Sequence, residues 1–278
     1  MKKLLTVITA FALTGAAALT TQASPQQDLV EFRAYFADRF PDVPFNDYVN
    51  GVYAIDAASR EQWEAIEEFP PYELNIDKGK SLFNEPFQNG KTYASCFRNG
   101  GIGIKQDYPY FDTNIGKVVT LEGEINACRE ANGEAPLKWK KSPMADISAY
   151  MAYTSRGNKT NVKIPADKGA LAAYNAGKAH FYSKRGQLNM SCADCHQFNA
   201  GNRIRADLLS PALGHTSHFP VYRSKWGGLG TIHRRYSGCN KQVRAKPFKA
   251  QSDEYSDLEY YHTFVSNGLE LNGPGARK

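Results

Sequence analysis

The segment from Cys192 to His196 constrains this chain more than any other part of its sequence. It reads Cys-Ala-Asp-Cys-His, which is the C-x-x-C-H pattern of covalent c-type haem attachment. In that pattern the thiols of Cys192 and Cys195 form thioether bonds to the porphyrin, and the imidazole of His196 binds the iron axially. The sequence therefore predicts one covalently attached haem c.

Two other interpretations of a C-x-x-C pair fit less well. A structural zinc site of this kind needs a second pair of ligands at matching spacing, and the remaining cysteines do not form one. A thioredoxin-like redox pair belongs to a strand–helix–strand context, which the flanking residues do not indicate. Haem attachment is the better supported interpretation.

The N-terminus has the three parts of a secretory signal peptide. The basic start Met1–Lys3 precedes an apolar run from Leu4 to about Ala18, and small residues follow up to Ala23. This run is short and rich in Ala, Thr and Gly, so an uncleaved membrane anchor is the less favoured alternative. We expect cleavage after Ala23, a periplasmic location and no membrane span in the mature chain.

The composition agrees with an exported globular protein. Of the 278 residues, 42% are hydrophobic and 22% are charged, a balance that argues against a disordered chain. The formal net charge of +6 falls by two when Lys2 and Lys3 are removed with the signal peptide. A charge this small, in a protein that leaves the cytoplasm, argues against nucleic-acid binding.

An ungapped internal repeat relates Cys128 to Cys239, an offset of 111 residues (128 to 239). The same register aligns further identical residues: Pro136 with Pro247, Lys138 with Lys249, Asp146 with Asp257, Tyr150 with Tyr261, Ser155 with Ser266, and Gly157 with Gly268. Upstream, a Gly-Lys-x-x-Phe segment precedes both Cys96 and Cys192. The predicted fold is mainly α-helical, with two tandem cytochrome c-like domains.

The first repeat lacks the residues that would hold a haem. Cys96 stands where a haem motif would begin, but the following residues 97–100 are Phe, Arg, Asn and Gly, without a second thiol or a histidine. We therefore expect an N-terminal extension over residues 24–74, a haem-less cytochrome c-like domain over 75–160, and a haem-binding domain over 161–278.

Cys96 and Cys128 are predicted to form a disulfide. If both positions once faced the same haem, the two thiols lie close together, and an oxidising compartment favours their pairing. A bond that closes a loop of this length stabilises the fold by about 3.5–4 kcal/mol in the chain-entropy description. The alternative is a pair of buried free thiols.

Cys239 is then the unpaired cysteine, and the haem iron needs a ligand opposite His196. No methionine follows Met190, which is too close to the attachment motif to be a natural ligand. The remaining candidates are Cys239 and the histidines His215, His218, His233 and His262. Cys239 is our first choice because its repeat counterpart is also a cysteine, and His233 is the second.

Basic residues surround Cys239 in the sequence. They are His233, Arg234, Arg235, Lys241 and Arg244, and a glycine-rich segment, residues 225–230, comes just before them. Nearby positive charge lowers the pKa of a thiol, and guanidinium groups bind oxyanions in a bidentate fashion. A solvated basic loop, or a docking surface for an acidic partner, would explain the same cluster.

Hydrophobic spacing and turn residues predict several helices. They are expected over about 28–40 and 57–68, before the first cysteine of each repeat, at the end of each repeat, and lastly over about 253–266. The repeats are expected to join near residues 157–168, and little strand is expected.

Taken together, these features resemble the SoxA family, the larger subunits of the SoxAX cytochromes of bacterial sulfur oxidation. The resemblance rests on the signal peptide, the repeat, the motif Cys192 to His196, and Arg235-x-x-x-Cys239 followed by basic residues. Some members carry haem in both domains. The residues after Cys96 make this chain resemble the single-haem subtype, in which a disulfide replaces the N-terminal haem.

The resemblance implies an L-cysteine S-thiosulfotransferase that works with a small monohaem cytochrome, SoxX. Thiosulfate would be coupled oxidatively to a cysteine of the SoxYZ carrier protein, and the electrons would pass through SoxX to a cytochrome. Cys239 matches the family's haem-ligating active-site cysteine, and Arg235 matches its substrate-orienting arginine. Lys241 and Arg244 are further candidates for binding the sulfonate. The alternative is a periplasmic monohaem electron carrier without transferase activity.

Overall fold

The computed structural model describes residues 24–277, so the predicted signal peptide lies outside the described residues. The helices are α1 (Pro25–Arg39), α2 (Ala57–Glu67), α3 (Glu73–Asn84), α4 (Leu121–Ala131), α5 (Met144–Tyr153), α6 (Lys168–Tyr182), α7 (Ile232–Gln242) and α8 (Asp253–Phe264). The short helical turns are η1 (Phe45–Ala54), η2 (Tyr93–Ser95), η3 (Arg98–Gly101), η4 (Lys105–Asp107), η5 (Asp194–Phe198) and η6 (Ser224–Trp226). The strands are β1 (Tyr110–Asp112), β2 (Lys117–Val119), β3 (Arg203–Ile204), β4 (Asp207–Leu208), β5 (Val221–Arg223), β6 (Gly228–Gly230) and β7 (Gly275–Arg277).

Side-chain caps fix where several helices begin. Ser24 accepts a hydrogen bond from the backbone N–H of Gln27 at the start of α1, and Pro25 occupies its first turn. Thr120 and Asp167 cap α4 and α6 in the same way. Such caps satisfy N–H groups that have no partner within the helix, and each contributes about 1 kcal/mol.

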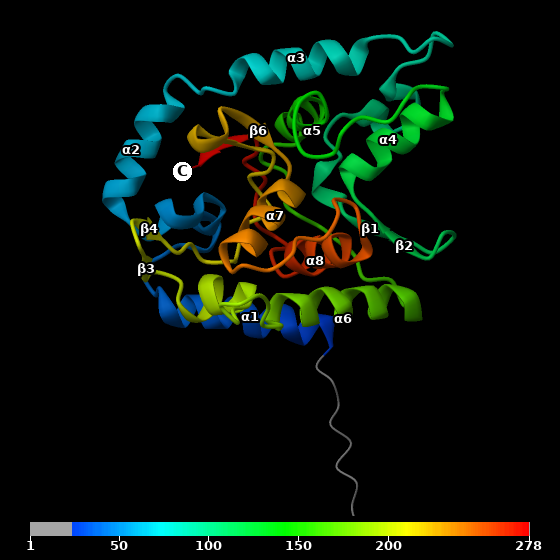
Figure 1. Ribbon diagram of the computed structural model, residues 1–278. Coiled ribbons are helices and arrows are strands. Elements are labelled where there is room, and N and C mark those ends of the chain that lie inside the picture. Colours follow the sequence, from blue (N-terminus) through cyan, green and yellow to red (C-terminus); the bar gives the residue numbers. More distant parts are fainter. Residues whose placement is uncertain (1–23, 278) are drawn as a thin grey trace, which may run out of the picture.

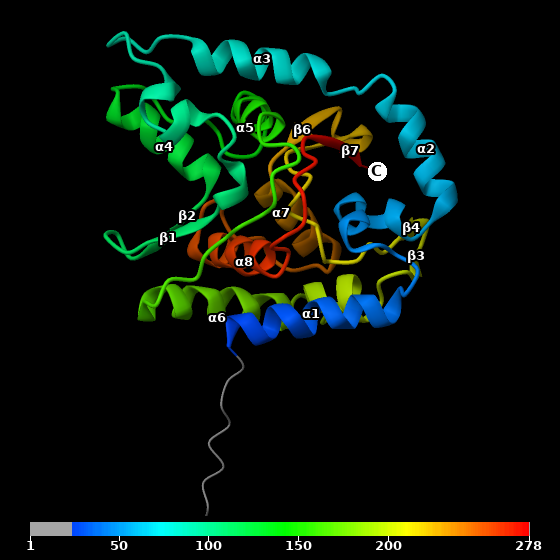
Figure 2. The same ribbon diagram turned by 180° about the vertical axis from the view of Figure 1, so that it is seen from behind.

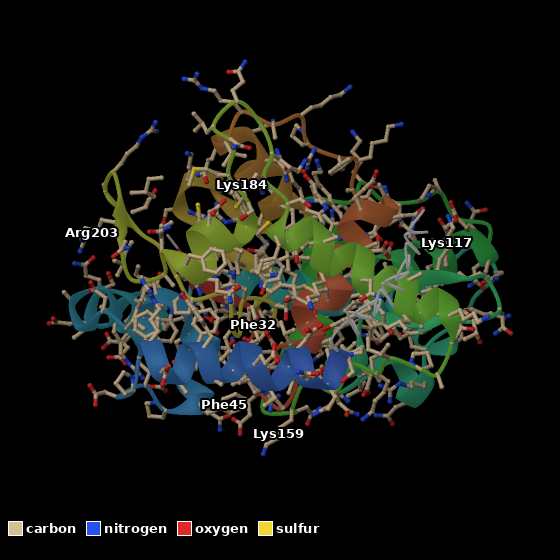
Figure 3. All side chains as sticks on the ribbon, turned by 90° about the horizontal axis from the view of Figure 1, so that it is seen from below. Phe32, Phe45, Lys117, Lys159, Lys184 and Arg203 are labelled. Carbon is tan, nitrogen blue, oxygen red and sulfur yellow. A yellow bond between two sulfur atoms is a disulfide. The ribbon has the colours of Figure 1, made fainter. Side chains whose placement is uncertain are left out.

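The N-terminal helix α1 packs along α6, and the two lie side by side in Figure 1. Asp28, which is buried, accepts hydrogen bonds from Tyr174 (2.9 Å) and from Lys178 (2.5 Å), both on α6. Phe32 contributes to the same core, and Figure 3 shows it on the inner side of α1, whereas Lys159 and Arg203 lie at the periphery. Helix α1 is therefore part of the second repeat's core.

The same elements recur at the offset of 111 residues that the sequence indicates. Helix α4 returns as α7, and the hairpin β1–β2 returns as β5–β6 with the same register, Tyr110 opposite Val119 and Val221 opposite Gly230. Strand β7 extends the second hairpin to a three-stranded sheet by pairing in parallel with β5. Helices α4 and α7, and the two hairpins, are thus structurally equivalent although few of their residues are identical.

One close helix crossing occurs in each repeat. A Cβ atom on Gly79 would lie 2.0 Å from the carbonyl oxygen of Asp146, and one on Gly177 would lie 1.9 Å from that of Asp257. Both distances are shorter than any real contact, so only glycine lets α3 approach α5 and α6 approach α8 this closely. The glycine of each Gly-Lys-x-x-Phe segment therefore permits the central helix pair of its repeat.

The two hairpins are exchanged between the repeats. Phe111 and Val118 of the first hairpin pack in the core formed by α6 and α8. Their counterparts, Tyr222 and Leu229, pack against Ala145 and Ala149 on α5. Figures 1 and 2 show α7 and α8 between the α1–α6 layer and the α3–α5 side of the molecule. This exchange buries apolar surface from both repeats and holds them against each other.

The expected helices are present over the described residues, with boundaries shifted by a few positions. The first begins at Pro25 rather than Asp28, and the last ends at Phe264. Strands are short, as expected. Two helices were not predicted, α4 and α7, and these carry Cys128 and Cys239. No helix over residues 24–277 is both long and apolar enough to cross a membrane.

Candidate functional site

The C-x-x-C-H segment follows α6, and a local hydrogen-bond ring shapes its start. The backbone N–H and hydroxyl of Ser191 both donate to the carboxylate of Asp194, at 2.8 and 2.9 Å. The backbone N–H of Asp194 donates back to the Ser191 hydroxyl. These bonds lower the pKa of Asp194 and fix the turn that presents Cys192 and Cys195.

A backbone contact of His196 occupies one ring nitrogen and leaves the other to face the site. Its Nδ1 lies 2.9 Å from the carbonyl oxygen of Ser210, so Nδ1–H is the donor. A metal-binding histidine commonly donates its second ring nitrogen in this way, because the bond fixes the tautomer and the ring orientation. Nε2 of His196 is then the nitrogen available to a metal.

Cys239 lies on α7, with its thiol hydrogen-bonded to the imidazole of His196. Burial alone would raise the pKa of this thiol. The guanidinium of Arg235, the contact with His196 and the guanidinium of Arg223 outweigh burial and lower the pKa to about 7. Cys239 is therefore poised to be a thiolate near neutral pH.

The three free cysteines gather at this place. Cys192, Cys195 and Cys239 are each partly buried and unbonded. Burial, then the neighbouring thiol of Cys239, raises the pKa of Cys192 to about 12 and raises that of Cys195 as well. The structure thus brings together the haem-attachment thiols, His196 and Cys239.

The second choice for the axial position, His233, is engaged elsewhere. Its Nε2 lies 3.0 Å from a carboxylate oxygen of Glu259, and its Nδ1 accepts a hydrogen bond from the backbone of Gln251. The first repeat has a similar link at the equivalent positions, where Ser148 donates to Glu122. His233 therefore joins α7 to α8, and the geometry favours Cys239 over it as the partner of His196.

His215, His218 and His262 form a chain of neighbouring rings that begins at His196. The ring centres of His196 and His215 are 4.6 Å apart, and those of His215 and His262 are 5.4 Å apart. Burial lowers the pKa of His215, His218 and His262, so these imidazoles are neutral. His218 and His262 lie close to backbone carbonyl oxygens. No group of three or more His, Cys, Asp or Glu residues within 24–277 has the geometry of a metal site.

The predicted anion-binding residues differ in their placement. Arg235 is half-buried on α7 and acts on Cys239, one helical turn away. Lys241 and Arg244 are exposed near the end of α7. Arg235 is thus the only one of the three predicted residues with a described electrostatic effect on Cys239.

The first repeat has a disulfide at the equivalent place. Cys96 and Cys128 are bonded, with their Cα atoms 5.8 Å apart, so the predicted bond is confirmed. Phe97 stands where the attachment motif would continue and is 5% exposed, packed among Phe83, Phe87 and Tyr93. Apolar side chains fill the core of the first repeat, and the disulfide joins the segment at Cys96 to helix α4.

Comparison with known proteins gives consistent matches. A model of the SoxA/TsdA cytochrome c domain matches residues 78–160. The chain is 56% identical to the L-cysteine S-thiosulfotransferase subunit SoxA of Chlorobaculum tepidum, over 92% of this chain and 89% of that protein. It is 55% identical to the protein of the same name from Allochromatium vinosum, over 93% and 92%.

The chain belongs to the SoxA family. A solved structure agrees with this assignment: the crystal structure of SoxXA from P. pantotrophus superposes with a TM-score of 0.71 at 36% identity, covering 78% of this chain and 84% of that one. The helix-rich cytochrome c-like SoxA fold is therefore shared, and the predicted resemblance is confirmed.

The donor set of this SoxA protein fits a haem c. Two thiols at the spacing of covalent attachment lie beside an imidazole whose Nδ1 is bonded to the backbone, and a third thiol contacts that imidazole. An imidazole and a thiolate would supply the two axial ligands. The backbone contact at Ser210 would hold His196 in the orientation that ligation requires.

One residue beside Cys239 was missed at the sequence level. Arg223, at the end of β5, lies close enough to Cys239 to lower the pKa of its thiol. It precedes Cys239 by sixteen positions, a separation that matches no helical spacing. Strand pairing and the fold of the β5–β6 hairpin bring it there, and no local motif in the sequence indicates this.

Proposed function

We propose that this SoxA protein is the periplasmic subunit of an L-cysteine S-thiosulfotransferase. It would couple thiosulfate to a cysteine thiol of the SoxYZ carrier. In this reaction a carrier thiol and thiosulfate give a carrier S-thiosulfonate, one proton and two electrons. The observation that carries the proposal is the Cys239 thiol, which faces His196 and lies under the positive charge of Arg235.

One haem c would be attached through Cys192 and Cys195, with His196 and Cys239 as axial ligands. When bound, the haem supplies one-electron redox chemistry and a Lewis-acidic iron that favours the thiolate. The orientation of His196, whose Nε2 is left to face Cys239, and the absence of a disulfide at Cys192, Cys195 and Cys239 support this assignment. Residues 24–74, 75–160 and 161–278 would be the extension, the haem-less domain and the haem-binding domain.

Cys239 would be the nucleophilic residue. Its sulfur would bond to the terminal, sulfane sulfur of thiosulfate, with loss of one proton and two electrons. The carrier thiolate would then attack that sulfane sulfur and displace the thiolate of Cys239. Splitting the coupling into two steps at one thiolate is a general advantage of covalent catalysis. A thiol pKa of about 7 keeps Cys239 both reactive and able to leave.

Arg235 would orient thiosulfate by binding its sulfonate. A guanidinium group presents two parallel N–H donors that match a pair of sulfonate oxygens. Lys241 and Arg244 would attract the anion from the exposed rim, where screening by water and salt makes their contribution small.

The two electrons would leave through SoxX, the small cytochrome partner, to a cytochrome acceptor. One structural neighbour is SoxXA from P. pantotrophus, and this supports a heterodimer for the present chain. The rival function is an electron carrier without transferase activity. It accounts for the haem motif but gives no role to a low-pKa thiol flanked by arginines.

The test is turnover by the haem-loaded heterodimer with thiosulfate, SoxYZ and an oxidised cytochrome. The proposal predicts cytochrome reduction that depends on both thiosulfate and the carrier, with one S-thiosulfonate added per carrier in the mass spectrum. Cytochrome reduction without a modified carrier would support the electron carrier instead.

A further inference from the structure

Arg223 carries a buried polar atom that the protein does not satisfy. Its Nε is inaccessible to solvent and has no hydrogen-bond partner, and no carboxylate among residues 24–277 forms an ion pair with this side chain. Leaving such a group unpaired costs about 1–3 kcal/mol, more when it is charged. A buried guanidinium N–H without an acceptor can be satisfied by a ligand that binds beside it.

The side chain lies beside the reactive thiol. Arg223 acts electrostatically on Cys239, and the charge of Arg235 acts unfavourably on the charged form of Arg223. The ring of Trp226 limits where Arg223 can go, because the guanidinium carbon lies 5.4 Å from the ring centre. Two guanidinium groups thus act on one thiol, and the carboxylate that acts on Arg223, that of Asp207, forms no ion pair with it.

Arg234 provides a contrast on the same indole. Its guanidinium carbon lies 4.1 Å from the Trp226 ring, and its Nη1 donates to the carbonyl oxygen of Leu229 at 3.1 Å. The side chain of Arg234 is therefore engaged by contacts within the β5–β6 hairpin and its connecting turn. Arg223 and Arg234 contact the same ring, but only Arg223 has a buried nitrogen left without a partner.

The positions of the first repeat that correspond to the two arginines carry acidic residues. At the offset of 111 residues, Arg223 corresponds to Asp112 and Arg235 corresponds to Glu124. Glu124 accepts hydrogen bonds from Tyr108 at 2.7 Å and from Tyr110 at 3.1 Å, and so is satisfied internally. Equivalent positions thus carry two acids in the first repeat and, in the second, two arginines that act on the free thiol.

A doubly charged oxyanion accounts for this pair of arginines. Like charges brought together in a partly buried place repel, and a bound dianion removes the repulsion and supplies acceptors to both groups. A sulfonate has three oxygens, so it can accept hydrogen bonds from the paired N–H donors of two guanidinium groups. A thiol has no oxygen and cannot do so.

We propose that Arg223 is a second sulfonate-binding residue, which with Arg235 holds the charged end of thiosulfate while its sulfane sulfur reaches Cys239. This inference rests on the proposed function and adds to it a residue outside the local basic cluster. Substrate binding then depends on the β5–β6 hairpin as well as on α7.

The test uses the haem-loaded heterodimer and three variants of this chain. Arg223→Gln removes the charge, Arg223→Lys keeps the charge without the fork, and Arg234→Gln removes a neighbouring charge on the same indole. For each protein we would measure thiosulfate binding by calorimetry, the KM and kcat for thiosulfate, and the visible spectrum and haem content.

The inference predicts that Arg223→Gln weakens thiosulfate binding and raises KM about tenfold or more, with a smaller change in kcat. Arg223→Lys should be intermediate, and Arg234→Gln should stay within about twofold of the unmodified protein. Haem content and spectrum should be unchanged in all three.

Three results would overturn it. Equal losses in Arg223→Gln and Arg234→Gln would reduce the effect to net charge. An unchanged KM and affinity in Arg223→Gln would remove the role altogether. Lower haem content or a shifted spectrum in Arg223→Gln, with unchanged affinity for thiosulfate, would assign Arg223 to a haem carboxylate. Arg223-dependent binding without turnover would instead overturn the proposed function and leave the binding site intact.

Discussion

The two repeats of this SoxA protein place a cysteine at the same point of the same helix and surround it differently. In the first repeat Cys128 is bonded to Cys96, and apolar side chains fill the core around it. In the second repeat Cys239 is free, faces His196 and lies beside two arginines. One backbone thus supports either a disulfide or a free thiol with a lowered pKa, depending on a few neighbouring side chains.

A second pair of equivalent residues shows the same divergence. Asp146 is buried and satisfied, with Lys78 at 3.2 Å and Asn75 at 2.9 Å. Its counterpart Asp257 is partly buried without such partners, because the positions of Lys78 and Asn75 are taken by Ala176 and Ala173. Burial, then Asp253 and Glu254, raises the pKa of Asp257 to about 7. The buried aspartate of the first repeat is therefore better supplied with hydrogen-bond and ion-pair partners than its counterpart in the second.

The largest expected effect comes from removing the reactive thiol. Cys239→Ala should lower the coupling rate at least a thousandfold, because the proposed covalent step has no other nucleophile. The measurement is thiosulfate-dependent cytochrome reduction by the heterodimer. Retention of more than a tenth of the activity would contradict the role given to Cys239.

Removing the disulfide tests the first repeat. The double variant Cys96→Ala/Cys128→Ala should lower the free energy of unfolding by about 2–4 kcal/mol, because the unfolded chain regains loop entropy. Denaturant unfolding measures this loss. The KM for thiosulfate should be unchanged, and a large rise in KM would show that the first repeat takes part in substrate binding.

Removing the charged residue one helical turn before each cysteine tests whether the two repeats differ in substrate binding. Arg235→Ala should raise the KM for thiosulfate about tenfold to a hundredfold, the loss of one charge-assisted bidentate contact, and leave the haem spectrum nearly unchanged. Glu124→Gln, the matched change in the first repeat, should leave KM unaltered. Normal rates for Arg235→Ala at low thiosulfate would disprove the orienting role.

The smallest expected effects come from the two aspartates. An acid whose pKa is higher in the folded than in the unfolded protein reduces stability as the pH rises between those two values, here about 4 and 7. Asp257→Asn should therefore stabilise the protein by about 1–2 kcal/mol at pH 8 and change little near pH 4. Unfolding midpoints at the two pH values measure this difference.

Asp146→Asn is the matched control. It removes a charge that Lys78 and Asn75 satisfy, so it should destabilise the protein by about 1–3 kcal/mol at pH 8. Effects of the same sign for the two variants would mean that the repeats do not differ in the way described.

Much of the fold was predictable because the repeat preserves residues with local roles. Gly79 and Gly177 are the residues that allow each helix crossing, and the aligned identities share one offset with α4, α7 and both hairpins. Helix α7 was not predicted, since Gly238 and a run of basic residues interrupt its apolar spacing. The strands have two or three residues each, too few to produce an alternating pattern.

The site could be predicted where its chemistry is local in sequence. The motif from Cys192 to His196 and the spacing from Arg235 to Cys239 are short patterns with direct chemical meaning. Arg223 and the engagement of His233 by Glu259 depend on tertiary contacts between separate elements, which no local pattern reports. The geometry that favours Cys239 over His233 is therefore visible only in the structure.

Cys239 is proposed to bind the haem iron opposite His196, whereas its counterpart Cys128 is bonded to Cys96. The most direct test is the electron paramagnetic resonance spectrum of the oxidised heterodimer, with the unmodified chain beside Cys239→Ala. We predict a low-spin thiolate signal from this chain's haem that disappears in the variant. An unchanged spectrum would place another residue on the iron and contradict the account.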